Sequence, residues 1–388
     1  MWIKREISPI VVDLAAKKPA ILLTGARQTG KTSLLQYLFP KADYVSFDWP
    51  ANADAAENNP SEFLSRFSGP VIFDEIQYVP SLFRYLKVVI DANRRECGKW
   101  ILTGSQKFHL MKGVSESLAG RIGVLELNTL SANEIRDNNL AVDDYLMKGG
   151  FPELWAGADI DPDQFFQDYI VTYLERDLKK VLEVSNLRAF DRFIRSMSLR
   201  VGQLCNFSQV SQDAGVTAAT GKKWFDVLQA SNIFSTLEPY FNNQLKRLVK
   251  SPKVYVKDQG LLNFILNIHN EEEMRHSHYY GSLFENFVYN EISRQAELKK
   301  FNRSLFFYRD KNNLEVDFVL ERGNVIKLIE VKTGEYPRQA LNNLNKVKEK
   351  LGSRYNVELY VACQIPTESP QIIDNCTFYN PVRHYIAW

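Results

Sequence analysis

The chain has 388 residues, which is enough for two or three domains of ordinary size. Its 45% hydrophobic residues supply packed cores, and a net charge of only +2 excludes nucleic-acid binding that depends on overall positive charge. The 4 cysteines include no C-x-x-C pair, which argues against a zinc site or a disulfide scaffold. The start does not resemble a signal peptide, and no apolar run reaches the roughly 18 residues of a membrane span. We therefore expect a cytoplasmic protein without membrane contact.

The first strong pattern is a phosphate-binding loop. The apolar run Ala20 to Leu23 leads into a glycine-bounded loop, and an amphipathic stretch begins at Lys31. This order predicts strand, turn and helix, and the loop fits G-x-x-x-x-G-K-[ST]. Its glycines let backbone N–H groups turn toward a phosphate, and the helix dipole adds positive potential. We expect ATP to contact Gly25, Ala26, Arg27, Gln28, Thr29, Gly30, Lys31, Thr32 and Ser33, with Lys31 at the β- and γ-phosphates.

Strands and helices alternate after this loop. Strands are predicted at Tyr44 to Asp48, Pro70 to Glu75 and Lys99 to Ser105, and helical stretches at Ser61 to Phe67 and Leu82 to Asn93. Strands separated by helices of this length favour a parallel sheet covered on both faces. Ligands of such sheets gather at the carboxyl ends of the strands.

Two carboxylates stand where one of these strands ends. Asp74 is a natural ligand for the Mg²⁺ that Thr32 would hold, and Glu75 is placed to deprotonate the attacking water. The alternative is a strand that leaves the sheet with two ordinary surface acids. Because the phosphate loop precedes them, we favour ATP hydrolysis over structural nucleotide binding.

Two further residues are candidates for the γ-phosphate. Ser105, in Thr103-Gly104-Ser105-Gln106, would contact this phosphate or the water from a neighbouring strand end. Arg121 precedes the apolar strand Ile122 to Leu127 and would stabilise phosphate charge in this subunit or in a neighbour's, within a homo-oligomer. The alternatives are a capped strand end and a surface arginine.

Five segments, in this order, resemble the prokaryotic ATPases of the AAA-14 type that carry a C-terminal DUF4143 domain. The resemblance covers essentially the whole chain and implies an AAA-type ATPase core over residues 1–155. Family members usually have proline where this chain has Ala26; that position contributes only its backbone. The segments are Gly25-Ala26-Arg27-Gln28-Thr29-Gly30-Lys31-Thr32, Phe73-Asp74-Glu75-Ile76-Gln77, Leu102-Thr103-Gly104-Ser105, Ser117-Leu118-Ala119-Gly120-Arg121 and Gly149-Gly150-Phe151-Pro152-Glu153.

The middle of the chain predicts two smaller elements. Residues 156–200 form a helical lid, because Asp163 to Lys180 has apolar residues three or four apart. Within it, Glu175-Arg176-Asp177 resembles a recurrent family motif, with a salt-bridged helix surface as the alternative. Residues 201–260 predict a winged helix-turn-helix: helices Phe207 to Ala214 and Thr217 to Leu228 around Gly215, then strands Asn232 to Leu237 and Lys253 to Val256.

This winged helix is a candidate DNA-binding surface. Its second helix would place side chains in the major groove, and a basic wing would hold the DNA backbone. A protein–protein module is the alternative. The helix residues are Thr217, Thr220, Lys222 and Lys223, and the wing residues are Lys246, Arg247 and Lys250.

Residues 261–388 predict an αβββαβ domain. The helix Gly281 to Ser293 is followed by strands Leu305 to Tyr308, Leu314 to Leu320 and Val325 to Lys332, the helix Arg338 to Leu351 and the strand Val357 to Cys363. By strand alternation, Leu314, Val316 and Phe318 share one face, with Glu315 and Asp317 on the other, while Glu330 and Lys332 share a face. Asp317, Glu330 and Lys332 thereby form a possible metal-dependent phosphodiesterase site, with salt bridges on an exposed sheet face as the alternative.

This order resembles the PD-(D/E)xK nuclease fold, to which DUF4143 domains are commonly related. In that fold an acid often comes from the first helix, and Glu285 matches the position. Glu291 competes for this role, because it falls near the middle of the helix's apolar arc, where an acid needs a partner, a metal or a raised pKa.

The fold class is therefore α/β: a P-loop NTPase sheet of AAA/STAND-like type, a helical lid, a winged helix-turn-helix and a restriction-endonuclease-like domain. We expect an ATP- and Mg²⁺-dependent ATPase coupled to a DNA-binding or nuclease-like half. The alternatives are an ATP-regulated nuclease and a DNA-binding or protein-interaction regulator with an inert nuclease-like domain.

Overall fold

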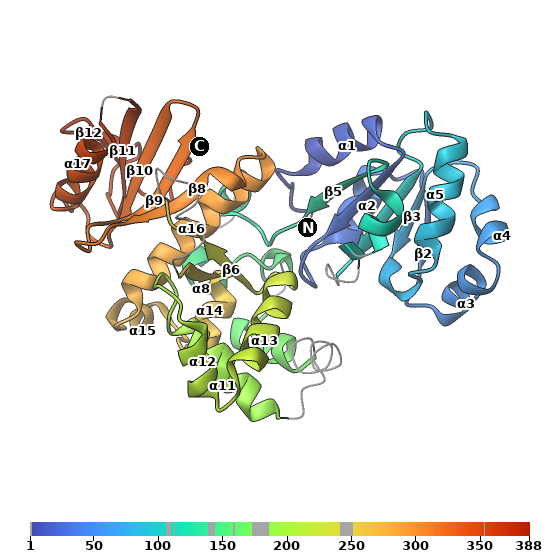
Figure 1. Ribbon diagram of the computed structural model, residues 1–388, viewed down its shortest axis with the longest axis horizontal. Helices are drawn as coiled ribbons and strands as arrows, with labels where there is room; N and C mark the ends of the chain where they lie inside the picture. Colours follow the sequence, from blue (N-terminus) through green and yellow to red (C-terminus); the bar gives the residue numbers. More distant parts are fainter. Residues whose placement is uncertain are drawn as a thin grey trace. The chain divides into compact units, whose positions relative to one another are not determined.

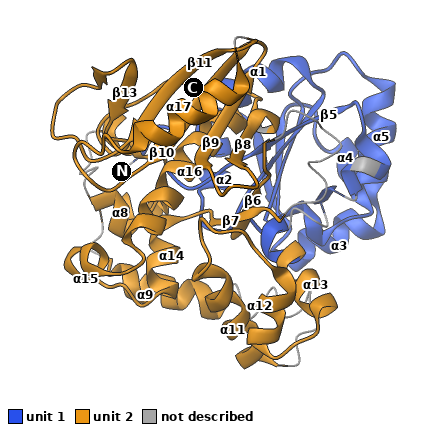
Figure 2. Ribbon diagram, turned by 60° about the vertical axis from the view of Figure 1, so that its left-hand side comes forward, with its two compact units in different colours: residues 1–130, 227–232 blue, residues 131–226, 233–388 orange. Residues whose placement is uncertain are grey.

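The chain divides into two compact units, each with its own sheet (Figure 2). Unit 1 comprises residues 1–130 and 227–232, and unit 2 comprises residues 131–226 and 233–388. The structure is a computed structural model, and it describes residues 2–105, 110–111, 113–138, 144–157, 160–172, 186–240, 251–352 and 354–388. Over these ranges, no helix combines the length and the apolar character needed to cross a bilayer.

Unit 1 contains a five-stranded sheet in the order β2-β3-β4-β1-β5, and all of its neighbouring strands are parallel (Figure 1). This confirms the predicted parallel sheet. The strands are β1 (Ala20–Thr24), β2 (Asp43–Ser46), β3 (Val71–Asp74), β4 (Trp100–Gly104) and β5 (Ile122–Glu126). The helices are α1 (Ser8–Lys17), α2 (Lys31–Leu38), α3 (Pro50–Asn58), α4 (Pro60–Ser65) and α5 (Leu82–Ala92), with a 3₁₀ turn η1 (Ile76–Tyr78) and a π-helical turn η2 (Val114–Leu118).

The core of unit 1 is aromatic around β3. The ring of Phe73 lies 5.5 Å from Phe47, 5.8 Å from Phe63 and 5.9 Å from Trp100, between ring centroids. All residues of β3 are buried, and the strand is paired with β2 on one side and with β4 on the other. The two acids that follow it, Asp74 and Glu75, therefore stand on a rigid strand end.

Unit 2 begins with helical elements that hold residues 131–155. Asn263 Nδ2 donates to the Leu146 carbonyl at 2.7 Å, and Asp258 Oδ2 accepts from the Gly150 N–H at 2.9 Å. Residues 131–155 therefore belong to unit 2 in the structure, whereas the sequence pattern assigns them to the ATPase core. Its helices are α7 (Ala132–Asp137), α8 (Tyr145–Lys148), η4 (Pro152–Trp155), α9 (Pro162–Tyr169), α11 (Leu187–Ser198), α14 (Gln259–Ile265) and α15 (Glu271–His276).

The predicted helix-turn-helix elements are present as α12 (Phe207–Ala214) and α13 (Ala218–Ala230). Gly215 ends α12 with φ of 74°, in the left-handed region that glycine favours. The antiparallel pair β6 (Phe234–Leu237) and β7 (Lys253–Val256) follows as predicted. The wing residues Lys246, Arg247 and Lys250, and the lid motif Glu175-Arg176-Asp177, lie outside the described residues.

The second sheet has six strands in the order β12-β13-β11-β10-β9-β8. Its first elements follow the predicted αβββαβ order, and the β12–β13 pair extends the sheet beyond that prediction. The elements are α16 (Tyr280–Leu298), η7 (Asn302–Ser304), β8 (Leu305–Arg309), β9 (Glu315–Arg322), β10 (Val325–Val331), α17 (Ala340–Leu351), β11 (Asn356–Ala362), β12 (Gln371–Ile373) and β13 (Cys376–Tyr379).

A bulge interrupts β9 and corrects one prediction. Phe306 pairs with Val319 and Tyr308 with Val316, so two residues of β9 stand opposite the single residue Phe307. A bulge of this kind breaks the alternation of side chains. Val316 accordingly packs in the core with α17, whereas Phe318 lies 6.2 Å from the ring of Tyr289 on α16. The prediction that these two side chains share a face is wrong.

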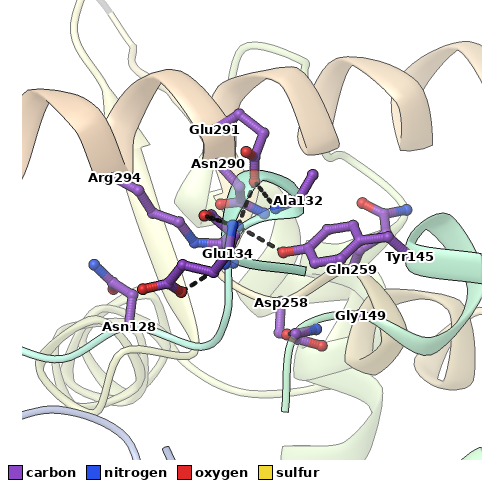
Figure 3. Close-up of polar contacts among 12 residues, drawn as sticks. Asn128, Ala132, Glu134, Tyr145, Gly149, Asp258, Gln259, Asn290, Glu291 and Arg294 are labelled. Carbon is purple, nitrogen blue, oxygen red and sulfur yellow. Dashed lines mark hydrogen bonds and ion pairs between the residues drawn. The ribbon is translucent and has the colours of Figure 1, made fainter. Parts of the chain in front are cut away.

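A buried ion pair explains the acid in the apolar arc of α16. Arg294 Nη1 lies 2.7 Å from Glu291 Oε1 and donates to the Tyr145 hydroxyl at 2.6 Å. Glu291 also accepts the Ala132 N–H at 3.2 Å. Figure 3 shows these side chains pointing toward one another. Glu291 therefore has a structural partner, and the pair joins α16 to α7 through Glu291 and to α8 through Arg294.

We predict that Arg294→Met destabilises the protein by about 3–5 kcal/mol, because it removes a buried cation that bonds both Glu291 and the Tyr145 hydroxyl. Arg275→Met is the matched control: it removes an arginine from an exposed i,i+4 pair with Glu271, and should cost no more than about 1 kcal/mol. Urea unfolding of the two variants measures the difference. Equal losses of stability would contradict the importance assigned to the buried pair.

Candidate functional site

The phosphate loop is held in shape by its glycines and by a distant arginine. Gly25 has φ of 147°, and a Cβ there would lie 2.2 Å from the Leu127 carbonyl oxygen. Gly30, with φ of 86°, starts α2 in the left-handed region. Arg5, itself buried, donates to the Thr29 carbonyl at 2.9 Å. Side chains at either glycine would thus distort the turn.

Lys31 lies at the start of α2 with its ammonium turned onto the loop. Its Nζ donates to the Gly25 carbonyl at 3.2 Å and to the Ala26 carbonyl at 2.7 Å. Burial lowers the pKa of Lys31 to about 8, although the carboxylates of Glu75 and Asp74 favour its charged form. A phosphate in the loop would replace the carbonyls as the partner of this ammonium.

Thr32 and Asp74 meet as the sequence pattern predicts. Thr32 Oγ1 donates to Asp74 Oδ2 at 2.9 Å, and the Tyr44 hydroxyl donates to the same oxygen at 2.8 Å. Burial raises the pKa of Asp74, against these two hydrogen bonds. Among the described residues, none hydrogen-bonds its buried Oδ1. A hydroxyl beside a carboxylate with an unused oxygen fits a Mg²⁺ ion, so these residues suit the ion that the pattern implies.

The backbone conformation of Glu75 sets the direction of its side chain. It has φ of 54° and ψ of 45°, a left-handed conformation that is uncommon for a side chain of this size. Its Oε2 accepts from Gln77 Nε2 and, at 3.3 Å, from Ser105 Oγ. β3 and β4 are neighbours, and their ends bring Glu75 and Ser105 together, whereas the contact of Ser105 with the γ-phosphate or the water stays a prediction. Gln106 lies outside the described residues.

Several residues of this site have no assigned role in the sequence pattern. Tyr44 and Asp48 come from β2 and the turn after it, and burial together with Glu75 raises the pKa of Asp48. Tyr44 and Asp48 could have been found from the position of β2 beside β3, because the carboxyl ends of parallel strands meet at one side of the sheet. Gln77 follows the acids by two residues. Arg5 carries no sequence signal, since its contact spans 24 residues of chain.

Arg121 lies at the amino ends of the strands, opposite the carboxyl ends that the phosphate loop and the acids follow. Its carbonyl accepts the N–H of Ala20, the first residue of β1, whereas the phosphate loop follows the last. Its guanidinium is paired with Asp91 at 2.6 and 2.8 Å. The prediction that Arg121 contacts the γ-phosphate of its own subunit is therefore wrong. A contact with a neighbour's nucleotide stays a prediction, and it would require Arg121 to leave Asp91.

The acids of the C-terminal domain surround a lysine instead of forming a metal site. Lys253 Nζ lies 2.7 Å from Glu315 Oε1, 3.1 Å from Glu285 Oε1 and 3.5 Å from Asp317 Oδ1. Across the described part of the chain, no group of three or more His, Cys, Asp or Glu side chains is arranged to hold a metal ion. The predicted set of Glu285, Asp317 and Glu330 does not fit a divalent metal as it stands, because an ammonium lies among the carboxylates.

The neighbouring residues of that cluster are paired as well. Lys332 Nζ donates to Glu330 Oε1 at 2.8 Å, and Asp317 Oδ2 accepts the Val331 N–H at 2.8 Å. Burial raises the pKa of both Glu285 and Glu330. Burial alone would lower the pKa of Lys253, but its surrounding carboxylates outweigh that effect and raise it. Glu285, and not Glu291, is thus the acid of α16 that faces this cluster.

The candidate DNA-contacting residues of α13 have local roles. The Thr217 hydroxyl accepts the Thr220 N–H at 3.1 Å, as an N-terminal cap does. Lys222 lies 2.5 Å from Asp226 and 5.8 Å from the ring centres of Phe207 and Phe225. Lys222 and Lys223 are nonetheless exposed, so their charges face solvent.

Three family models match the chain: an AAA domain over residues 17–136, a domain of unknown function (DUF8612) over 139–272, and a domain of unknown function (DUF4143) over 280–381. The middle model spans the ranges in which the sequence pattern predicts a lid and a winged helix-turn-helix.

Two curated relatives are the uncharacterized proteins Rv2008c of Mycobacterium tuberculosis and Mb2031c of Mycobacterium bovis. Each is 30% identical over 307 residues, which cover 79% of this chain and 68% of the relative.

Two solved structures resemble parts of the chain at 16% identity. The Walker-type ATPase PABY2304 of Pyrococcus abyssi matches 68% of this chain and 96% of its own, with a TM-score of 0.43. The RuvB Holliday junction branch migration motor of Thermotoga maritima matches 60% of this chain and 89% of its own, with a TM-score of 0.32.

We predict that the affinity for a nucleoside triphosphate falls about tenfold between pH 7 and pH 9, because Lys31 loses its proton as the pH rises through its lowered pKa of about 8. Isothermal titration of the Glu75→Gln variant would measure binding without turnover. An affinity that stays constant up to pH 9 would contradict the assignment of this pKa to Lys31.

Proposed function

Because the chain belongs to the family in which an AAA domain precedes a C-terminal DUF4143 domain, we propose that it binds ATP with Mg²⁺ and hydrolyses it. The observation that carries this proposal is the hydrogen bond between Thr32 and Asp74, at 2.9 Å. This bond joins α2, the helix that follows the phosphate loop, to the acidic end of β3. The loop itself follows β1, and β3 lies two strands from β1, about 10 Å across the sheet.

In this proposal, the residues around this hydrogen bond have separate roles in ATP hydrolysis. Lys31 and the loop N–H groups would bind the β- and γ-phosphates, and Thr32 and Asp74 would hold Mg²⁺. The ion, when bound, neutralises phosphate charge. Glu75 would accept a proton from the attacking water, since it is oriented by Gln77 and Ser105 at the same strand edge.

We expect Lys31→Ala to abolish ATP binding and Glu75→Gln to retain ATP binding while lowering the turnover number by a factor of about 10²–10⁴. The first change removes the cation that pairs with the phosphates, and the second leaves an amide that accepts no proton. Phosphate-release kinetics and equilibrium ATP titration measure the two effects separately.

Glu62→Gln is the matched control for Glu75→Gln, because Glu62 is an exposed acid of unit 1 in an ion pair with Arg66. Its turnover should equal that of the wild type. Normal turnover in Glu75→Gln would remove Glu75 from the role of general base.

We propose in addition that the helix-turn-helix of unit 2 binds DNA. In support, α12 and α13 pack closely, since a Cβ on Gly221 would lie 1.9 Å from Ser211 Oγ, and the same element exposes Lys222 and Lys223. A rigid helix with two exposed lysines suits a groove lined by phosphates.

Lys223→Glu should weaken binding to duplex DNA and reduce the slope of log affinity against log salt by about 1, as expected for one lost phosphate contact. Lys348→Glu on the exposed side of α17 changes the net charge equally and should leave the slope unchanged. Fluorescence anisotropy across a salt series measures both. Absence of DNA binding in the wild type would favour a protein-interaction module instead.

A further inference from the structure

The ammonium of Lys253 occupies the centre of the acidic cluster of the C-terminal domain. Its side chain is 2% exposed and lies within 3.5 Å of carboxylate oxygens of Glu285, Glu315 and Asp317. These three acids come from α16 and β9, whereas the lysine comes from β7, in the hairpin that follows the helix-turn-helix. The cluster therefore carries its own cation, supplied by a separate segment of the chain.

Other donors of the protein complete the shell around these acids. The Tyr255 hydroxyl donates to Glu285 Oε1 at 2.8 Å, Arg309 lies 3.1 Å from Glu315 Oε2, and the Val331 N–H takes the second oxygen of Asp317. Mg²⁺ and Mn²⁺ need about six oxygen ligands at roughly 2.1 Å, and a carboxylate engaged by an ammonium does not present its lone pairs to a metal in that way. A divalent ion would also face the positive charge of Lys253 at short range.

The hairpin that carries Lys253 is docked to the same sheet by its backbone. The Tyr240 N–H donates to the Phe307 carbonyl at 2.6 Å, and the Phe307 N–H donates to the Glu238 carbonyl at 3.1 Å. These bonds cover the edge of β8, at the residue opposite the bulge that contains Asp317. The ion cluster and the edge pairing thus hold the hairpin at one place on the C-terminal domain.

We propose that Lys253 takes the place of a divalent metal in this domain, so that its acids bind the hairpin of the helix-turn-helix and do not support metal-dependent cleavage of nucleic acid. Metal-dependent phosphodiester hydrolysis needs an ion that activates water and neutralises phosphate charge. A lysine paired with three carboxylates does neither.

The test is Mn²⁺ binding by the full-length chain without nucleotide, measured by isothermal titration and by electron paramagnetic resonance. All proteins carry Asp74→Asn, which removes the ligand at the phosphate loop. We expect no Mn²⁺ site at the C-terminal cluster in this background. Adding Lys253→Met should create one site per chain, and adding Asp317→Asn to Lys253→Met should remove that site again.

Lys257→Met is the matched control, because Lys257 also pairs with an acid of α16, at 2.8 Å, and that acid is Glu297, which is not one of the three cluster acids. It should create no site. A Mn²⁺ site present before the lysine is changed and lost on Asp317→Asn would overturn the proposal, as would failure of a folded Lys253→Met variant to bind Mn²⁺. If Lys253→Met does not fold, the proposal is still tested by comparing Mn²⁺ binding with and without Asp317→Asn in the protein that keeps Lys253. Since ATP is absent, neither result depends on hydrolysis.

Discussion

Burial of charged side chains is the constraint on which both units depend. Removing an ion from water is costly unless an opposite charge or several hydrogen bonds replace the solvent. Lys31 in unit 1, and Lys253 and Arg294 in unit 2, are each almost fully buried. In unit 2, Lys253 has carboxylate partners on α16 and β9. Arg294 pairs with Glu291 on its own helix and donates to the Tyr145 hydroxyl, so each cation joins segments far apart in the chain. In unit 1 the ammonium is met by loop carbonyls, which leaves it suited to a phosphate.

The parallel sheet of unit 1 converts this constraint into a site. The loop after β1, the acids after β3 and Ser105 after β4 all follow carboxyl ends, so the sheet brings them to one edge. The order of strands places β4 between the loop and the acids, and Ser105 accordingly contacts Glu75. The same geometry separates Arg121 from the phosphate loop, because Arg121 precedes β5 whereas the loop follows β1.

In unit 2 similar residues produce a different result. The acids of α16 and β9 converge on a lysine that β7 supplies. The bulge in β9 and the pairing of residues 238–240 with β8 place the hairpin beside these acids. The ion pairs of these acids with Lys253 hold the β6–β7 hairpin to the C-terminal domain.

The sequence by itself determined the features whose residues lie close together along the chain. The loop from Gly25 to Thr32, the acids Asp74 and Glu75 at a strand end, and α12 with its terminal Gly215 all follow from local rules of backbone and side chain. Only the tertiary structure decided between Glu285 and Glu291, placed Lys253 among the acids, paired Arg121 with Asp91 and moved Phe318 to the other face of β9. Each of these depends on a partner far away in the chain or on a bulge that alternation does not reveal, and such contacts are selected only when the folded chain packs and pairs its buried charges.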